Sequence, residues 1–373
     1  MYKSFIPVHQ PEITKADIKS VSQAISNAEI SGQSNIVYQF EKDFAKWQGC
    51  KFAISVTSGT AALFLAVKVL NLRKKDEILI SSSTNIATAL SVYHNNLTII
   101  PVDSNPNTWN MNVKLIEKLI TKKTKVIIPV HFLGNPVEMN IIKKISKKHN
   151  LKIIEDCAES HGATIKNKKL GTFGDLACYS FYSNKVITTG EGGMITTNNK
   201  QYYEELKLLK NLYFSKPRFY HKKPAFNFRM GALQASLGLS QLKRINGILK
   251  KKTKVFKTYE KYLKNVDGIS LQKILKKHIS AYWMIGIFVD KNKFGMDKNN
   301  LESNLVKFGI ETRNFFYPMN KQPFLKTKKF YNSCPISMSL WNNGLYLPSS
   351  NNLKLKDIKF ICDIIIDCKI KKF

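Results

Sequence analysis

Short apolar stretches alternate with amphipathic ones along residues 52–155, and this alternation restricts the possible folds more than any other feature. The expected strands are residues 52–56, 77–81, 97–102, 126–130 and 152–155. The expected helices between them are residues 61–70, 86–93, 113–120 and 140–149. Strands that alternate with helices predict an α/β fold, in which helices flank a mostly parallel sheet on both faces. Such sheets bind ligands at the carboxyl ends of their strands, so we expect functional residues there.

The chain of 373 residues is long enough for one large or two modest domains with buried cores. A lysine-rich helix expected at residues 246–265 marks the transition between two domains. We therefore predict a large domain of residues 1–250 and a smaller C-terminal α+β domain of residues 251–373. The other expected elements are helices at residues 36–47, 201–212, 232–245, 299–308 and 356–370 and a strand at residues 283–289. Polar loops are expected in the rest of residues 1–50, and an irregular aromatic and basic loop at residues 213–226, of a kind that is often functional or interfacial.

The formal net charge of +33 raises the possibility of a nucleic-acid-binding module. Nearly all of the positive charge is lysine, scattered in twos and threes along the whole chain. Nucleic-acid-binding proteins usually concentrate charge on one face and use arginine for bidentate contacts. We therefore predict no nucleic-acid partner, although the charge would help to attract a polyanionic small substrate.

Neither the cysteines nor the apolar stretches indicate a metal, a disulfide framework or a membrane. The six cysteines show no metal-ligand spacing, so no metal site is expected. No apolar stretch approaches the roughly 20 residues that cross a bilayer. The first 20 residues contain no apolar segment of the signal-peptide type. The expectation is a cytoplasmic protein without membrane insertion.

Lys185 differs in its setting from the many lysines that have polar neighbours. It lies between an aromatic strand, which includes Tyr179 and Phe181, and the glycine-rich turn of residues 190–193. A lysine beside an apolar wall loses hydration, so its pKa can fall and its amine can become a nucleophile. This pattern predicts either a reactive or a simply buried lysine.

Three further positions lie where the expected strands end. Residues 57–60 join a strand to a helix through small residues, as phosphate-binding helix starts do, although Ser and Thr there also serve as helix caps. Asp156 follows the strand at residues 152–155 and either caps the next helix or is the anion for a buried cationic ring. His131 follows the strand at residues 126–130, where it is either structural or catalytic. A phosphate cradle, an acid and a desolvated lysine together match the needs of pyridoxal phosphate: a lysine for its aldehyde, a carboxylate for its ring nitrogen, and a helix start for its phosphate.

The chain resembles the DegT-type nucleotide-sugar aminotransferases, which are fold-type I pyridoxal-phosphate enzymes. The resemblance spans nearly the whole chain. The matching segments are SGTAAL (58–63), VDSNPNTWNMN (102–112), PVHFLGNPVEM (129–139), IIEDCAESHGA (153–163), TTGEGGM (188–194), FNFRMGALQASLGLSQL (226–242), GIETRNFFYP (309–318) and GLYLP (344–348). The DCAES and GIETRNFFYP versions look most like the perosamine-synthase branch, which aminates 4-keto-6-deoxyhexoses carried on a nucleoside diphosphate.

The resemblance implies a role for each matching residue. Lys185 would form the Schiff base with the cofactor and, once displaced, would shuttle the proton. Asp156 would pair with the pyridine nitrogen, and Glu159 would lie near the phenolic oxygen. The implied phosphate contacts are Gly59, Thr60, Ser180 and, from the neighbouring subunit of a homodimer with shared active sites, Asn227. The implied substrate-side residues are Arg313, Tyr317 and His131.

Two positions depart from the pattern of the family. The family usually places an aromatic residue on the cofactor ring where this chain has Asn85, so either this stacking is lost or another group covers the ring. Many relatives have a histidine after the proline of the FFYP segment, where Met319 and Asn320 stand here. The second departure bears on the identity of the sugar and not on the cofactor.

The resemblance implies a ping-pong transamination from glutamate to a nucleotide-linked keto sugar, with a product used in a surface polysaccharide such as O-antigen. One alternative is a sugar dehydratase of the same family. Those relatives replace the lysine with histidine, so the presence of Lys185 argues against it. Another alternative is a regulator that binds the cofactor without turnover.

Overall fold

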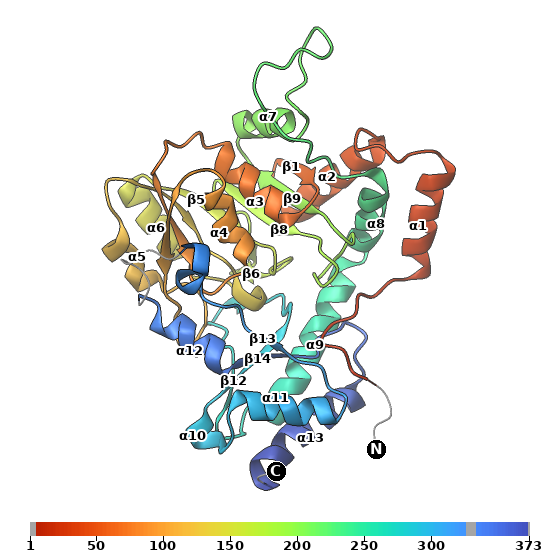
Figure 1. Cartoon of the computed structure of the whole chain (residues 1–373). Coiled ribbons are helices and arrows are strands. Elements are labelled where there is room, and N and C mark those ends of the chain that lie inside the picture. The colour runs from red at the N-terminus through yellow and green to blue at the C-terminus, as the bar shows by residue number, and fades with distance from the viewer. Residues whose placement is uncertain (1–4, 326–332, 372–373) are drawn as a thin grey trace.

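The computed structural model describes residues 5–325 and 333–371 and is built around a seven-stranded sheet (Figure 1). Its strands are β1 (Phe52–Val56), β2 (Glu77–Ser81), β3 (Thr98–Val102), β4 (Thr124–Ile128), β5 (Lys152–Asp156), β8 (Leu176–Ser180) and β9 (Gly193–Thr197). Their spatial order is β1-β9-β8-β5-β4-β2-β3. Only β9 runs antiparallel to its neighbours, β1 and β8. The prediction of an α/β fold with a mostly parallel sheet is therefore confirmed.

Helices bury the sheet on both faces. One face is covered by α3 (Gly59–Lys68), α4 (Ile86–Tyr93) and α7 (Lys200–Leu209), and the other by α2 (Asn35–Gln48), α5 (Val113–Leu119), α6 (Met139–His149) and α8 (Ala232–Lys243). Successive strand residues enter different cores: Ile153 packs with the second helix group and Ile154 with the first. Burial on both faces explains why the strands are continuously apolar rather than alternating.

A second unit follows along the long helix α9 (Ile245–Leu263), which extends from the sheet core into a separate core. This unit has an antiparallel sheet in the order β10 (Ile269–Leu271), β12 (Ile285–Val289), β14 (Gly344–Leu347) and β13 (Arg313–Asn314). Its other helices are α10 (Lys291–Phe294), α11 (Lys298–Lys307), α12 (Pro335–Asn343) and α13 (Leu355–Lys371). Ile6 from the N-terminal segment also packs in this second core. The division at residue 250, which lies inside α9, stays a prediction.

The remaining elements are short. Strands β6 (Thr164–Ile165), β7 (Lys168–Lys169) and β11 (His278–Ile279) form a small sheet. Three 3-10 turns span Phe132–Gly134, Met319–Lys321 and Pro323–Leu325. Within residues 5–325 and 333–371, no helix combines the length and the apolar composition needed to cross a bilayer.

The prediction for residues 1–50 was incomplete, because helix α1 (Lys15–Ser26) lies in a stretch expected to be polar loop. Only Asp17 and Ala24 of this helix are buried, so its apolar periodicity is weak. Its start is instead fixed by a reciprocal capping box, in which the Thr14 and Asp17 side chains each accept the other residue's backbone N–H. The T-x-x-D pattern was the available signal for this helix. Most other predicted elements begin and end within three residues of the observed bounds.

Candidate active site

A cavity of about 340 Å³ lies at the carboxyl ends of β1, β5 and β8. It is lined by Ser58, Gly59, Thr60, Leu63, Thr84, Asn85, Ala87, Val130, Asp156, Ala158, Glu159, Ser180, Tyr182, Asn184, Lys185, Glu191, Trp283 and Phe316. A larger and more open groove of about 640 Å³ lies beside β10 and contains none of the predicted site residues. We take the smaller cavity as the candidate active site, because it lies where a parallel sheet binds ligands.

Lys185 lies in the turn between β8 and β9 and borders this cavity. The residue is partly buried. Burial lowers the pKa of Lys185, and the nearby Glu159 and Asp156 carboxylates partly oppose this shift. The predicted desolvated lysine is therefore present, and it shares one cavity with two acids.

Asp156 is the last residue of β5 and is almost completely buried. Its Oδ2 accepts a hydrogen bond from Thr88 Oγ1 at 2.8 Å, and its Oδ1 accepts one from the Ala158 N–H at 3.1 Å. Burial raises its pKa, whereas Thr88, Ala158 and the positive charge of Lys185 pull the pKa down. The carboxylate therefore lies within the electrostatic influence of Lys185, and its backbone contact closes a turn rather than capping a helix.

Glu159 reaches the same cavity from the turn after β5. Its Oε2 accepts a hydrogen bond from the Leu133 N–H at 2.8 Å. Burial raises the pKa of Glu159 to about 7, against the opposing charge of Lys185. A carboxyl group with that pKa can gain or lose a proton near neutral pH.

The start of α3 forms the side of the cavity next to β8. Ser58 caps this helix, and its Oγ accepts the Ala61 N–H at 3.1 Å. Gly59 and Thr60 follow, and both border the cavity together with Ser180. A Cβ atom on Gly59 would lie 2.8 Å from the Cβ of Ser180, so only glycine allows this approach. The first helical amides, which lack carbonyl partners in the helix, can therefore bind an anion held between α3 and β8.

Asn85 lines the cavity as well, and it also has a structural role. Its Oδ1 accepts the Ala87 N–H at 3.0 Å and so caps α4. The aromatic side chains that border the cavity are Tyr182, Trp283 and Phe316. None of the three is close to Asn85 in sequence. An aromatic side chain from another part of the cavity lining can therefore cover a bound ring in place of residue 85.

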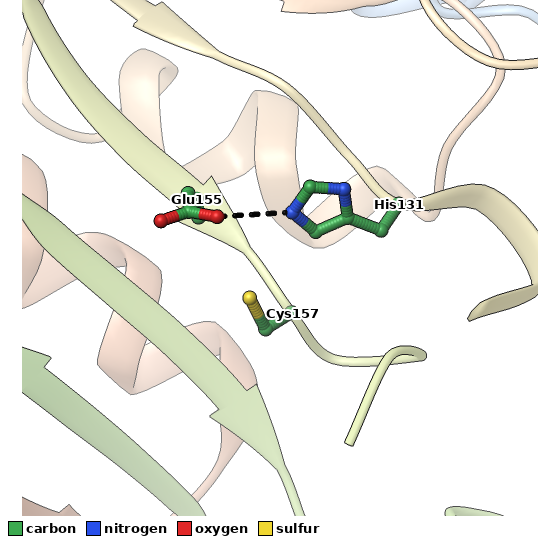
Figure 2. Close-up of side chains that lie close together, drawn as sticks. All are labelled: His131, Glu155 and Cys157. Carbon is green, nitrogen blue, oxygen red and sulfur yellow. Dashed lines mark hydrogen bonds and ion pairs between the residues drawn. The ribbon is translucent and has the colours of Figure 1, made fainter. Parts of the chain in front are cut away.

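His131 lies apart from the cavity lining, in a buried group with Glu155 and Cys157 (Figure 2). Its Nε2 lies 3.3 Å from Glu155 Oε2, and its Nδ1 accepts the Val137 N–H at 3.2 Å. The ring proton is therefore on Nε2 and is donated to Glu155. His131 was predicted on the substrate side, but its side chain is 0% exposed.

The His131–Glu155–Cys157 group has the residue types of a metal site, and its ligand atoms lie within 4.8 Å of one another. The Glu155 oxygens already accept hydrogen bonds from three backbone N–H groups at 2.7 to 2.8 Å, those of Gly171, Phe173 and Gly174. These bonds tie the loop before β8 to β5. We therefore assign the group a structural role.

The other predicted substrate-side and phosphate residues also lie outside the cavity lining of their own chain. Arg313 is exposed and pairs with Glu311 at 3.3 Å. Tyr317 is 36% exposed and makes an edge contact with Trp341. Asn227 is exposed, and it forms an isolated β-bridge with Asn211 in the segment between α7 and α8. Their predicted roles stay predictions.

Several residues in or behind the cavity lining were missed in the sequence, and Thr88, Trp283 and Phe316 are the most informative of them. Thr88 binds Asp156, but an ordinary helical threonine carries no distinctive signal. Trp283 and Phe316 come from the second unit, so only its packing against the first unit brings them to the cavity. Phe316 belongs to the segment GIETRNFFYP (309–318), in which the neighbouring Tyr317 was the residue expected on the substrate side.

Comparison with known proteins gives a consistent result. Residues 11–366 match the model of the DegT/DnrJ/EryC1/StrS aminotransferase family. The chain is 35% identical to the GDP-perosamine synthase of Escherichia coli O157:H7, covering 97% of this chain and 98% of the relative. It is also 35% identical to the dTDP-3-amino-3,6-dideoxy-alpha-D-galactopyranose transaminase of Aneurinibacillus thermoaerophilus, covering 93% and 94%. Among solved structures, Helicobacter pylori PseC, an aminotransferase involved in the biosynthesis of pseudoaminic acid, matches with a TM-score of 0.93 at 26% identity, covering 99% and 100%.

Proposed function

The chain belongs to the DegT/DnrJ/EryC1/StrS aminotransferase family, and on this premise we propose that it moves an amino group from glutamate to a nucleotide-linked 4-keto-6-deoxyhexose. It is a pyridoxal-phosphate-dependent sugar aminotransferase. The observation that carries the proposal is one cavity in which Lys185, Asp156 and the start of α3 meet.

These residues fit pyridoxal phosphate on three counts. Lys185 offers an amine whose pKa is lowered by burial, as attack on an aldehyde requires. Asp156 offers a buried carboxylate for a protonated ring nitrogen. Gly59, Thr60 and Ser180 offer a helix start and hydroxyl groups for a phosphate. When bound, pyridoxal phosphate supplies the aldehyde that carries the amino group and a ring that withdraws electrons.

Each residue then has a task that follows from its position. Thr88 and the Ala158 N–H hold the Asp156 carboxylate in a fixed orientation, so its charge can stabilise a protonated ring nitrogen. Lys185, once free, would hold and move the transferred proton at its Nζ, first as a general base and then as a general acid. Glu159 also lines the cavity, and its pKa of about 7 allows it to accept or donate a proton near neutral pH.

The substrate part of the proposal rests on the resemblance of residues 156–160 and 309–318 to the perosamine-synthase branch. The two 35% identical relatives carry different nucleotides in their names, GDP and dTDP, so overall identity does not choose between them. The test is a panel of GDP-, UDP- and dTDP-linked keto sugars incubated with enzyme and glutamate, with the products read by mass. We expect amination of a 4-keto-6-deoxyhexose. A product that has lost water without gaining nitrogen would favour the dehydratase, and no turnover of any sugar would favour the regulator.

We also infer a homodimer in which Asn227 completes the cavity of a second copy. Asn227 is exposed, lies outside the cavity lining of its own chain, and belongs to the segment between α7 and α8, part of which projects from the body (Figure 1). The test mixes two inactive variants, Lys185→Ala and Asn227→Asp, whose added carboxylate would repel a phosphate. Mixed dimers then contain one intact site, and random exchange of subunits restores about a quarter of the wild-type activity. No recovery after proven subunit exchange would place Asn227 in its own chain's site or in none.

A further inference from the structure

The indole of Trp283 faces the amine of Lys185. The Lys185 Nζ lies 4.0 Å from the centroid of the ring, and both residues line the same cavity. Across residues 5–325 and 333–371, no hydrogen bond or salt bridge engages this amine, so the ring is its closest defined partner. Tryptophan is the side chain whose face attracts a cation most strongly.

Three hydrogen bonds fix the position of Trp283, which is only 3% exposed. Its Nε1–H donates to the carbonyl of Asn184, the residue before the lysine, at 2.7 Å. Its backbone N–H donates to the Leu133 carbonyl at 3.2 Å, and its own carbonyl accepts from Lys252 Nζ at 2.9 Å. The ring and the backbone of the lysine segment are therefore held together directly.

Leu133 links this arrangement to the acid side of the cavity. Its φ of 58° lies in the left-handed region, which is unfavourable for a bulky side chain. In that conformation its N–H donates to Glu159 and its carbonyl accepts from Trp283. One strained residue thus positions two of the groups that surround Lys185. Strain of this kind persists where the surrounding structure over-determines it.

We propose that Trp283 is a positioning residue for the proton transfer, and that its ring holds the free, charged amine of Lys185 at the cavity between proton transfers. This inference rests on the proposed function, because that reaction releases the lysine and makes it carry a proton. The attraction acts on the charged amine and vanishes for the neutral one, so it sets how readily the amine gives up its proton.

The other charged groups around Lys185 are known from the structure. Glu159 and Asp156 raise its pKa, as the ring would, whereas burial lowers it. The charge of Lys185 also acts on His9 and His161; burial is the main cause that lowers their pKa values to about 3, and for His9 the charges of Lys252 and Arg313 contribute before that of Lys185. Both histidines therefore stay neutral near neutral pH. The charged groups that act on the pKa of Lys185 are then the two carboxylates, and these do not change when only the Trp283 ring is altered.

The test changes the electronics of the ring and keeps its shape. Tryptophan with increasing numbers of ring fluorines is incorporated into the full-length protein, which weakens the attraction of the ring for a cation step by step. Cofactor-free protein is mixed with pyridoxal phosphate at a series of pH values, and the rise of the visible absorbance of lysine-bound cofactor is timed. Capture needs the neutral amine, so the pH midpoint of the rate reports the pKa of Lys185. We expect the midpoint to fall with each fluorine, by roughly 0.5 to 1 pH unit at full substitution.

The chain offers a matched control, since it has only three other tryptophans, Trp47, Trp109 and Trp341. In a Trp283→Phe background, fluorination of these three should leave the midpoint unchanged. A constant midpoint in the otherwise wild-type chain, or an equal fall in the Trp283→Phe background, would overturn the proposal. Capture of the cofactor needs neither sugar nor glutamate, so this result is independent of whether the proposed aminotransfer is found.

Discussion

The inner wall of the cavity and the segment of residues 313–317 were both expected to supply site residues, yet the structure places their side chains differently. The inner wall is built from Asp156, Ser180 and Gly59, which lie at or just beyond the ends of neighbouring strands. Arg313 and Tyr317 are exposed, and only Phe316 of that segment borders the cavity. The topology of a parallel sheet brings the carboxyl ends of its strands to one edge. No such rule decides which residue of the segment 313–317 points into the cavity.

This contrast predicts two classes of variant. Substitutions in the inner wall should affect the chemistry and the binding of the cofactor. Substitutions in residues 313–317 should affect mainly the binding of the sugar substrate. The variants below test this division, beginning with the largest expected effect.

Lys185→Ala should abolish the visible absorbance of lysine-bound cofactor and reduce turnover by at least about 10³-fold, because it removes both the amine and the general base. Absorbance spectra and a glutamate-dependent amination assay measure the two effects. Lys200→Ala, which removes an exposed lysine at the start of α7, should change neither. Full activity of the Lys185 variant would refute the assignment of the site.

Asp156→Asn should lower turnover by about 100-fold, because the neutral amide cannot stabilise a protonated ring nitrogen. The same change should raise the melting temperature of the cofactor-free protein at neutral pH. Burial raises the folded-state pKa of Asp156 above 3.8, so the ionised carboxylate destabilises the folded state once the pH exceeds that value. The gain should vanish below about pH 4, where the acid is protonated in both states, and grow as the pH rises.

The matched control is Asp363→Asn, which alters an exposed carboxylate paired with Lys359 at 2.6 Å. It should leave turnover unchanged and shift the melting temperature only slightly. A melting temperature of Asp156→Asn below the wild-type value at every pH would show that the carboxylate stabilises the fold, contrary to our account of its burial.

How well the sequence predicts the structure follows the same division. The strand end at Asp156 could be located from a short continuous apolar stretch, because such a stretch is typical of a strand buried on both faces of a sheet. The aromatic strand before Lys185 was expected as well, but β8 ends at Ser180 instead of including Phe181. Lys185 could be singled out by its neighbours. Trp283 could not, because its contact with Lys185 depends on how the second unit packs against the first, and no local pattern encodes that packing. The sequence places His131 just after a strand, as the structure does, but it does not show that the side chain contacts Glu155 instead of lining the cavity.

Gly59→Ala should weaken binding of pyridoxal phosphate by about 10-fold while leaving the protein folded. The added Cβ would meet Ser180 Cβ at 2.8 Å, and a clash of this kind costs about 1–3 kcal/mol. Titration of the cofactor into cofactor-free protein, followed by visible absorbance, gives the affinity. Gly247→Ala is the control, because nothing lies within 4 Å of a Cβ at that helical position. Equal affinities for the two variants would show that the start of α3 is not part of the cradle.

Arg313→Ala should have the smallest effect, a rise of about 3- to 10-fold in KM for the nucleotide sugar with kcat within about twofold of the wild type. An exposed guanidinium that already pairs with Glu311 contributes only about 0.5–1.5 kcal/mol to binding a charged substrate. Steady-state kinetics separates KM from kcat, and Lys293→Ala removes an exposed charge of the same unit as a control. A loss of kcat comparable to that of Asp156→Asn would abolish the division between the two regions, because Arg313 would then have to reach the reacting atoms. Unchanged KM would instead remove Arg313 from the substrate side and leave Phe316 as the one residue of its segment with a place in the site.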